Sequence, residues 1–327
     1  NGWIIGNDNS LSLKKQIENN SILLGQLDLR INIGINTGLN EVFIINEVLK
    51  NELINKSDKN IELIVPILRG RDIKSYSYNF SNYYLINSHN GIKSKNIEAI
   101  DVVNNYPSIF SYFEKFEDKL KKRYDQGKHW TNLRNCAYLE DFSKPKIIWG
   151  ELSDKAKFTY DDEKYFVDAT VFLMTGNNLK YILSIFNSKL AQWYFEQIAT
   201  SSGMGTNRWK KYKIEQFPIK EIKNINPFET LVDYVLLQNK NQLNSSFFER
   251  VLDAMVYEIY LPDLIKLNNA EVLKFLEDLP KLEENDEVNI KIIEKVQKDL
   301  SNPKHPISAS LLKLLTIEEI NIIEGRN

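Results

Sequence analysis

The sequence predicts a mixed α/β domain with an irregular sheet over residues 1–223, followed by an all-α helical domain over residues 224–327. In the first part, short runs of β-branched and aromatic residues end at glycines and prolines and alternate with helical patterns, as expected for a mixed sheet with packed helices. After residue 224, apolar residues recur with the helical period and prolines separate the segments, which predicts a group of short helices.

The composition is that of an ordinary soluble protein, with 43% hydrophobic and 26% charged residues. A chain of 327 residues is long enough for two domains and a substantial core. No apolar run reaches the roughly eighteen residues that a membrane helix needs, so we expect no membrane partner. The single cysteine, Cys136, cannot form an internal disulfide, which predicts a reducing, cytoplasmic location. Because the sequence begins with Asn1 rather than Met, we expect a fragment of a longer polypeptide.

The charges are distributed unevenly between the two predicted domains. Residues 224–327 carry 11 Lys and Arg against 18 Asp and Glu, a net charge of −7. Residues 1–223 carry 31 against 26, a net charge of +5. A basic first domain and an acidic second one are expected if only the first domain meets DNA, because the phosphates attract cations.

Local patterns predict the elements of each domain. Pro66 lacks a backbone N–H, so the strand that contains it is expected at a sheet edge or to end there. In the first domain we expect helices over 11–22, 47–54, 108–123 and 179–195, strands on both sides of a glycine-rich turn over 31–45, and strands over 61–68, 83–86, 145–149, 165–174 and 214–219. In the second domain we expect helices over 228–243, 246–260, 270–279, 290–300 and 309–323.

The most conspicuous basic stretch runs from Gly203 to Lys213 and contains four cations, two aromatic residues and no acid. Its two glycines allow the backbone to bend sharply or to approach a partner closely. A cationic loop with aromatic residues between packed elements is suited to contact phosphates and bases, although a solvated loop is the simpler alternative. The candidate DNA contacts in this stretch are Asn207, Arg208, Trp209, Lys210, Lys211 and Lys213.

Two further stretches combine cations with turn residues. Arginine can hold a phosphate or the O6/N7 edge of guanine with two hydrogen bonds, but Asp72 could instead neutralise an arginine beside it. A tryptophan in such a loop could line a DNA groove or pack beneath the loop. The candidate DNA contacts are Arg69, Arg71 and Lys74 in the first stretch, and Lys128, Trp130 and Arg134 in the second.

The residue patterns of a catalytic centre are missing. The three histidines are scattered, and no Cys/His spacing fits a zinc site. No serine lies in a G-x-S-x-G elbow. Asp263 with the following E-x-x-K segment departs from the spacing that would place a carboxylate and a lysine on one face of a strand. We therefore expect no catalytic residue, metal or cofactor in this fragment.

Seven segments, in the same order as in a known family, resemble its motifs. The matching residues are Gly34 to Ile45, Leu68 to Ile73, the D-x-G-x-x-W-x-x-L-R pattern of Asp125 to Arg134, Pro145 to Trp149, Tyr181 to Leu190, Arg208 to Tyr212 with Gln216 to Ile219, and Leu252 to Tyr260. Over roughly residues 3–260 the chain is similar to the TaqI-like C-terminal specificity domain, the target-recognition part of bacterial Type IIG restriction-modification enzymes and adenine-specific DNA methyltransferases.

The resemblance implies an irregular mixed α/β fold followed by helices, and a division of labour within a parent chain. A preceding adenine methyltransferase would hold S-adenosylmethionine and an Asn/Asp-Pro-Pro-Tyr/Phe motif, and an endonuclease domain would use Mg. Asn226-Pro227-Phe228 lacks the second proline of that motif. The resemblance therefore implies a module that binds double-stranded DNA and positions it for methylation at adenine N6 and for cleavage by the other domains.

Other classes of protein stay open at this point. Half of a Type I specificity subunit would need a second recognition domain and long coiled-coil spacers, whereas the C-terminal helices here are short and broken by prolines. A fragment with its own methyltransferase or nuclease activity would need the missing motifs. A protein-interaction adaptor that binds no DNA would be favoured if local acids neutralised the basic loops.

Overall fold

The computed structural model describes residues 8–198 and 207–326, except for the side chains of Asp8, Asn207 and Arg208. The α-helices are α1 (Asp8–Glu18), α2 (Asn40–Phe43), α3 (Glu47–Lys56), α4 (Val102–Asn105), α5 (Pro107–Glu114), α6 (Glu117–Lys121), α7 (Leu179–Phe186), α8 (Lys189–Ile198), α9 (Lys211–Ile214), α10 (Asn226–Lys240), α11 (Ser246–Tyr260), α12 (Pro262–Leu267), α13 (Asp286–Leu300), α14 (Pro306–Leu314) and α15 (Glu318–Glu324). The strands are β1 (Ile22–Leu23), β2 (Leu29–Ile33), β3 (Ile44–Asn46), β4 (Ile64–Leu68), β5 (Ile73–Lys74), β6 (Ser77–Tyr78), β7 (Tyr83–Ile86), β8 (Lys146–Gly150), β9 (Leu152–Ser153), β10 (Phe158–Asp161), β11 (Phe166–Val167), β12 (Val171–Gly176), β13 (Asn207–Arg208) and β14 (Pro218–Ile219).

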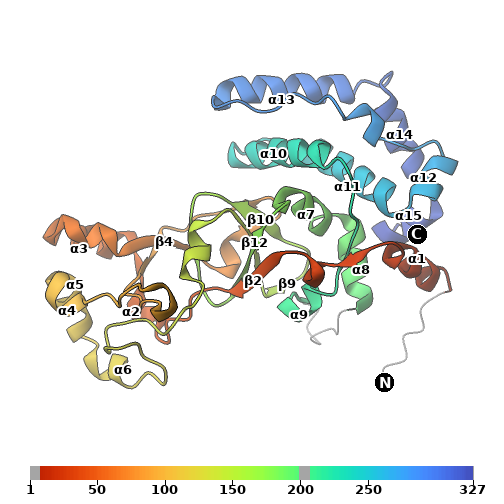
Figure 1. The fold of residues 1–327 in the computed structure, drawn as a ribbon. Helices are drawn as coiled ribbons and strands as arrows, with labels where there is room; N and C mark the ends of the chain where they lie inside the picture. Colours follow the sequence, from red (N-terminus) through yellow and green to blue (C-terminus); the bar gives the residue numbers. More distant parts are fainter. Residues whose placement is uncertain (1–7, 199–206, 327) are drawn as a thin grey trace.

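The molecule has three regions (Figure 1). In this view a lobe with α3–α6 lies on the left, a sheet of β2, β8, β10 and β12 lies in the middle, and α10–α15 lie above the sheet and to its right. In the described residues the last strand ends at Ile219, and everything from Asn226 onward is helix or connection. The predicted fold class, a mixed α/β part followed by an all-α part, is confirmed.

The central sheet is antiparallel with the order β10-β8-β12-β2. Its side chains alternate between two faces, as the period of two in a strand requires. Ile147 and Trp149 of β8 point to one hydrophobic core, while Ile148 between them belongs to the other. Both faces of the sheet are therefore covered, which explains why every residue of β8 is buried.

Two hydrophobic cores flank this sheet. We call the first the helix core, because it joins one face of the sheet to α1, α7, α8 and the C-terminal helices. The second is the lobe core, formed by the other face with β4, β7 and α5. Each buried large apolar side chain contributes roughly 1.5–3 kcal/mol relative to an exposed one, so the folded state depends on both cores.

A second sheet, in the order β11-β4-β7-β3, lies in the lobe core. Pro66 of β4 pairs with Tyr84 of β7, whereas β11 on the other side of β4 pairs only with Ile67 and Leu68. Within the described residues, β4 is thus paired on one side only at Pro66, as expected for a residue that cannot donate a hydrogen bond.

The helix expected over 179–195 is two helices, α7 and α8. Between them, the side-chain amide of Asn187 donates to the carbonyl of Phe158 at 2.9 Å and accepts from its amide at 3.0 Å. The backbone N–H of Lys189 donates to Oδ1 of Asp253 on α11 at 2.9 Å. Both contacts join residues distant in sequence, and the second satisfies the N–H of Lys189, the first residue of α8, which has no partner within that helix.

Other boundaries also differ from expectation. Val42 and Phe43 belong to the helical turn α2 rather than to a strand, and the helix expected over 108–123 is interrupted between α5 and α6. Of the strand expected over 214–219, only Pro218–Ile219 is a strand, β14, and Ile214 is the last residue of α9. The strand expected over 165–174 is divided into β11 and β12 by a turn at Asp168–Thr170. This last difference affects the candidate site directly.

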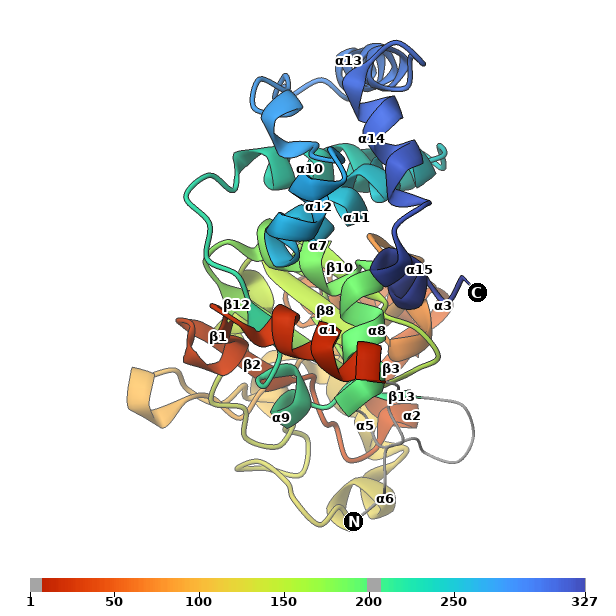
Figure 2. The same ribbon diagram turned by 90° about the vertical axis from the view of Figure 1, so that its right-hand side faces the viewer.

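Figure 2 shows α13 and α14 as an outer layer beyond α10 and α11. The helices expected over 246–260 and 290–300 correspond to α11 and α13, whereas 270–279 contains only a 3-10 helix at Leu273–Phe275. Because the helix core includes residues on both sides of position 224, the proposed division into residues 1–223 and 224–327 stays a prediction. No helix in the described ranges is long and apolar enough to cross a membrane.

Candidate nucleic-acid interface

An open groove lies between the ends of β4 and β8 and the turn that connects β11 to β12. Its volume is about 790 Å³. Short connecting segments form its walls, because each of these strands ends at the same place on the molecule. Its lining residues are Arg69, Gly70, Arg71, Ile73, Gly150, Glu151, Leu152, Ser153, Asp154, Lys157, Asp168, Ala169 and Thr170.

Arg69, the first predicted contact in this groove, has a structural partner. Its Nε lies 3.1 Å from Oδ2 of Asp72 and its Nη2 lies 3.2 Å from Oδ1, so the pair is bidentate. The guanidinium also stacks on Tyr83, 3.9 Å from the ring centroid. Its side chain is only 12% exposed. Asp72 therefore neutralises Arg69, which was the alternative to a DNA contact.

Asp72 is held in its ionised form by these contacts. Burial alone would raise the pKa of Asp72, but hydrogen bonds from Arg69 and Ser81 outweigh burial and lower the pKa below its ordinary value. The carboxylate also accepts the backbone N–H of Arg69 at 2.9 Å. The Arg69–Asp72 pair thus fixes the conformation of the 69–72 turn.

Arg71, on the same turn, is exposed and lines the groove. Within the described residues it makes no ion pair, in contrast to Arg69 two positions earlier. A free guanidinium on a fixed backbone can engage a phosphate or a guanine edge with little reorganisation. Arg71 is therefore the residue of this groove that is best placed to contact a base edge.

The turn at Asp168–Thr170 closes the groove on one side. Oδ1 of Asp168 accepts hydrogen bonds from the backbone N–H and the hydroxyl of Thr170. The hydroxyl oxygen of Thr170 accepts the N–H of Gly70 at 3.0 Å, and its carbonyl accepts the N–H of Glu151 at 3.0 Å. Sequence reasoning missed these residues, although Asp followed by Thr two positions later is typical of a side-chain-stabilised turn.

The basic stretch that ends at Lys213 also reaches this groove. The β13 backbone pairs with β9, so Asn207 lies opposite Ser153 and Arg208 lies opposite Leu152. Gly203 to Thr206 and the side chains of Asn207 and Arg208 lie outside the described residues. Two segments far apart in sequence, 69–71 and 207–208, thus meet at the same connecting loop.

Residues 65–219, which contain the groove and both segments, match the family model of the TaqI-like C-terminal specificity domain. This segment belongs to that family.

Relatives of the specificity domain were found among curated proteins and solved structures. The chain is 19% identical over 228 residues to Type II methyltransferase M.XhoI from Xanthomonas vasicola, covering 68% of this chain and 40% of the relative. It is 23% identical over 255 residues to Type II methyltransferase M.BanIII from Aneurinibacillus aneurinilyticus, covering 73% and 43%. It is 24% identical over 177 residues to Type II methyltransferase M.MjaIV from Methanocaldococcus jannaschii, covering 51% and 56%.

A solved structure supports the fold. It is that of the Type IIL restriction-modification enzyme MmeI in complex with DNA, with a TM-score of 0.52 and 9% identity. The match covers 84% of this chain and 36% of MmeI. The chain thus spans only about 40–56% of the curated relatives and about a third of this solved chain.

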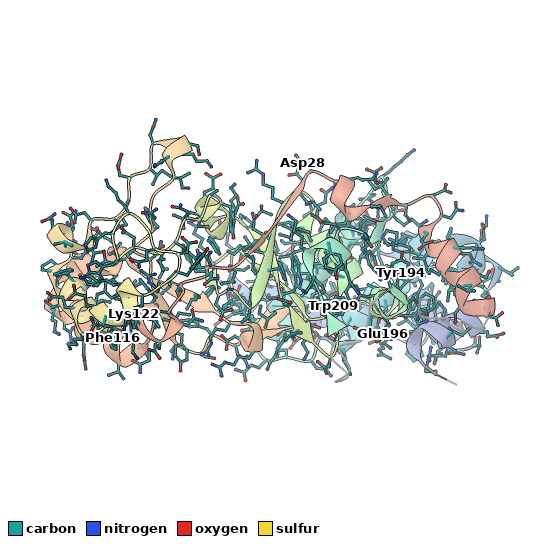
Figure 3. All side chains as sticks on the ribbon, turned by 90° about the horizontal axis from the view of Figure 1, so that it is seen from below. Asp28, Phe116, Lys122, Tyr194, Glu196 and Trp209 are labelled. Atoms are coloured by element: carbon teal, nitrogen blue, oxygen red, sulfur yellow. The ribbon has the colours of Figure 1, made fainter. Side chains whose placement is uncertain are left out.

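Trp209 of the specificity domain is part of the core rather than of a surface. It is 1% exposed and stacks on Phe195 with ring centroids 3.8 Å apart. The backbone N–H of Trp209 donates to the carbonyl of Glu151 at 2.8 Å, and the backbone carbonyl of Trp209 accepts the indole N–H of Trp149 at 2.9 Å. The expected DNA contact is therefore corrected, because a buried ring cannot stack on a base. Trp209 instead anchors the end of the basic stretch (Figure 3).

The lysines after Trp209 differ in accessibility. Lys210 lies 3.8 Å from Oε1 of Glu151, and Lys211 lies 3.6 Å from Oε1 of Glu215. Lys213 is 8% exposed and its Nζ donates to the carbonyl of Ile198 at 3.3 Å. Burial lowers the pKa of Lys213. Lys213 is thus corrected to a buried residue, whereas Lys210 and Lys211 keep exposed surface.

The third predicted stretch lies outside the groove. Nη2 of Arg134 contacts Oδ2 of Asp125 at 2.7 Å, and Trp130 is half-buried against Phe110. Lys128 is exposed. Figure 3 shows Phe116 and Lys122, from the same lobe, at the opposite end of the view from Glu196 and Tyr194, with Trp209 between. These residues do not share the groove with Arg71.

The loop at 123–134, which contains this third stretch, is nevertheless held in place by hydrogen bonds and close packing. The buried guanidinium of Arg123 donates to the carbonyls of Thr37 and Asn132, both at 2.9 Å, and to that of Trp130 at 2.6 Å. Gly127 is so closely packed that a Cβ there would lie 2.5 Å from Cβ of Asn132. Gly127 and the backbone carbonyl of Trp130 therefore help to hold the loop, while the DNA contacts expected for Lys128, Trp130 and Arg134 stay predictions.

Lys74 is exposed on β5 and lines a neighbouring groove of about 1040 Å³, between the β5–β6 hairpin and α10. Over the described ranges it makes no ion pair. The described residues also contain no cluster of three or more His, Cys, Asp or Glu side chains that could hold a metal.

Proposed function

We propose that the groove beside Arg71 binds double-stranded DNA and contributes to selection of a target sequence. One observation carries this proposal. Two arginine-bearing segments of the specificity domain, 69–71 and 207–208, converge on the loop at 151–153. Arginines on a fixed scaffold suit readout of guanine edges, while flanking lysines suit phosphates.

We further propose that the chain works within a restriction-modification enzyme. Its relatives are named as Type II methyltransferases, and the fold is similar to that of a restriction-modification enzyme. In this proposal, other domains methylate adenine at N6 with S-adenosylmethionine, and an endonuclease cuts DNA with Mg. Because a methyltransferase must extrude its target base from the stack, a separate module that holds the flanking duplex in register is mechanistically useful.

The observed ion pairs are compatible with DNA binding at most of the exposed positions. Arg134 and Asp125 are 36% and 41% exposed, and Lys210 and Glu151 are 37% and 28% exposed. Such surface pairs contribute about 1 kcal/mol or less, so a phosphate can replace the carboxylate at little cost. Arg69 is different because its bidentate pair with Asp72 is largely buried.

The test is selection from a randomised duplex library by the purified 327-residue chain. We expect enrichment of one short motif, and affinity for the selected duplex that exceeds affinity for a shuffled duplex at the same salt concentration. Affinity for both duplexes should fall as salt rises, since phosphate contacts release counterions. Enrichment of no motif, with equal affinity for all duplexes, would contradict the proposal.

A second candidate function is a protein-interaction adaptor that binds no DNA. The observation in its favour is that acids neighbour several of the predicted DNA-contacting cations, as in the Arg69–Asp72, Arg134–Asp125 and Lys211–Glu215 pairs. The adaptor predicts no measurable duplex binding even at low salt, which separates it from the DNA-binding proposal.

A further inference from the structure

We infer that Asp168 and Thr170 are positioning residues, which fix the position of Arg71 relative to the connecting loop at 151–153. This inference rests on the proposed function and names residues that control its specificity. Neither residue carries a positive charge, and the inference does not require either one to touch DNA. Their role is to join the two walls of the groove.

Thr170 forms hydrogen bonds to both walls of the groove, the 69–71 turn and the 151–153 loop. Its hydroxyl oxygen accepts the N–H of Gly70 on the arginine-bearing turn at 3.0 Å. Its carbonyl accepts the N–H of Glu151 on the opposite loop at 3.0 Å. The carbonyl of Glu151 accepts the N–H of Trp209, which immediately follows β13. A continuous series of hydrogen bonds therefore links the 69–71 turn to the 207–208 segment through Thr170.

Asp168 fixes the orientation of the Thr170 hydroxyl. Its Oδ1 accepts the Thr170 hydroxyl at 2.5 Å and the Thr170 N–H at 3.0 Å, so the hydroxyl donates to Asp168 and is left to accept from Gly70. Asp168 is 4% exposed, and its own N–H donates to the carbonyl of Leu68 at 3.0 Å. The threonine is thus anchored to the scaffold on which the arginine turn begins.

The walls are close together at this point. A Cβ added to Gly70 would lie 3.0 Å from Oγ1 of Thr170, and one added to Gly150 would lie 3.5 Å from Cα of Gly70. A Cβ on Gly34 would lie 2.0 Å from the carbonyl oxygen of Asp168. Gly34 thus allows a close backbone approach to Asp168, while Gly70 and Gly150 lie in contact with their neighbours across the groove. A site held by such packing and hydrogen bonds is suited to keep Arg71 in a fixed position.

The test compares Thr170→Val with Thr170→Ser in the duplex-binding assay of the purified chain. Valine keeps the shape of threonine but removes the acceptor for Gly70 and the donor to Asp168, whereas serine keeps both. We expect Thr170→Val to lower the ratio of selected-duplex to shuffled-duplex affinity about tenfold, and Thr170→Ser to keep that ratio. Thr316→Val is the matched control, because Thr316 is exposed and hydrogen-bonded to the carbonyl of Lys313 in the C-terminal region.

A double-mutant cycle with Arg71→Ala separates positioning from direct contact. If Thr170 acts through Arg71, Thr170→Val should cause little further loss of preference in the Arg71→Ala background. Fully additive losses, or an unchanged preference in Thr170→Val, would overturn the inference while the DNA-binding proposal stands. If the wild-type chain prefers no duplex, the proposed function itself fails. Circular dichroism of each variant establishes that the fold is intact.

Discussion

Arg69 and Arg71 show how two neighbouring arginines can have different roles. Arg69 forms a bidentate pair with Asp72 and stacks on Tyr83, so it holds the turn. Arg71 is exposed to the groove. A motif with two arginines around a glycine therefore supplies one structural guanidinium and one that is available for a ligand.

At the same scale, Arg208 provides a prediction for base readout. Its planar fork can engage a guanine edge with two hydrogen bonds. We expect Arg208→Ala to weaken binding to the selected duplex by about 1–3 kcal/mol and binding to shuffled DNA much less. Arg250→Ala, an exposed arginine of α11, is the control and should change neither affinity. Equal losses on both duplexes would make Arg208 a phosphate contact.

The neighbouring lysines should act without regard to sequence. In Lys210→Ala and Lys211→Ala, binding to every duplex should weaken because a phosphate contact is lost. The slope of log K against log salt should become shallower by about 0.9 for each contact removed. Titrations at several salt concentrations measure this slope. An unchanged slope in both variants would return these lysines to the role of solvated surface residues.

Among the elements, the turns and interruptions depend most on tertiary contacts. Local pattern predicted helices for α3, α11 and α13 and strands for β7 and β8, because their apolar periodicity is continuous. The same pattern predicts one continuous helix where the structure has α7 and α8. The interruption between them involves contacts distant in sequence, in which Asn187 bonds to Phe158 and Asp253 accepts from Lys189. The turn at Asp168 was missed for a similar reason, because its partners are distant in sequence.

Part of the candidate site was also predictable. The sequence identified the two arginine-bearing segments, but it could not show that β9 and β13 pair and bring them together. Trp209 and Lys213 were misjudged because a basic, aromatic stretch has the same composition whether its side chains face solvent or the core. Burial at these positions depends on packing against Phe195 and on the carbonyl of Ile198.

The junction of α7, α8 and α11 predicts a pH dependence of stability. Burial raises the pKa of Asp253 to about 7, from an ordinary value of 3.8. Between these values the folded state binds a proton that the unfolded state releases, so the free energy of unfolding should rise as pH falls from about 7 toward 4. Above pH 7 the charge on the half-buried Asp253 destabilises the fold in full.

Asp253→Asn keeps the oxygen that accepts from Lys189 and removes the charge. We expect the variant to be more stable than the wild type at pH 8 by about 1 kcal/mol or more, with a difference that shrinks as pH falls. Urea unfolding at pH 8, 6 and 5 measures this difference. Asp263→Asn, at an exposed position on α12, is the control. A constant difference across these pH values would contradict the prediction.

For the whole molecule, the helix core predicts that the first 223 residues need the C-terminal helices. Phe228, Leu231 and Val235 of α10 pack with α7 in that core. Their removal exposes an apolar face, at roughly 1.5–3 kcal/mol for each large side chain uncovered. We expect residues 1–223 alone to bind a hydrophobic dye and to melt at a lower temperature than the whole chain. A cooperative melt at an unchanged temperature would show instead that residues 1–223 fold independently.

The central sheet has a consequence for how such a chain can change over generations. A substitution at Ile147, Ile148 or Leu173 must suit a core on its own side of a sheet that is covered on both sides. Arg71 and Leu152 lie outside both cores at exposed positions, Arg71 just after β4 of the second sheet and Leu152 just after β8 of the central sheet. New residues can therefore be tried at the groove at little cost to folding, while the sheet that carries it tolerates few replacements. We therefore expect accepted substitutions to accumulate mainly at the groove, the surface that is proposed to contact the ligand.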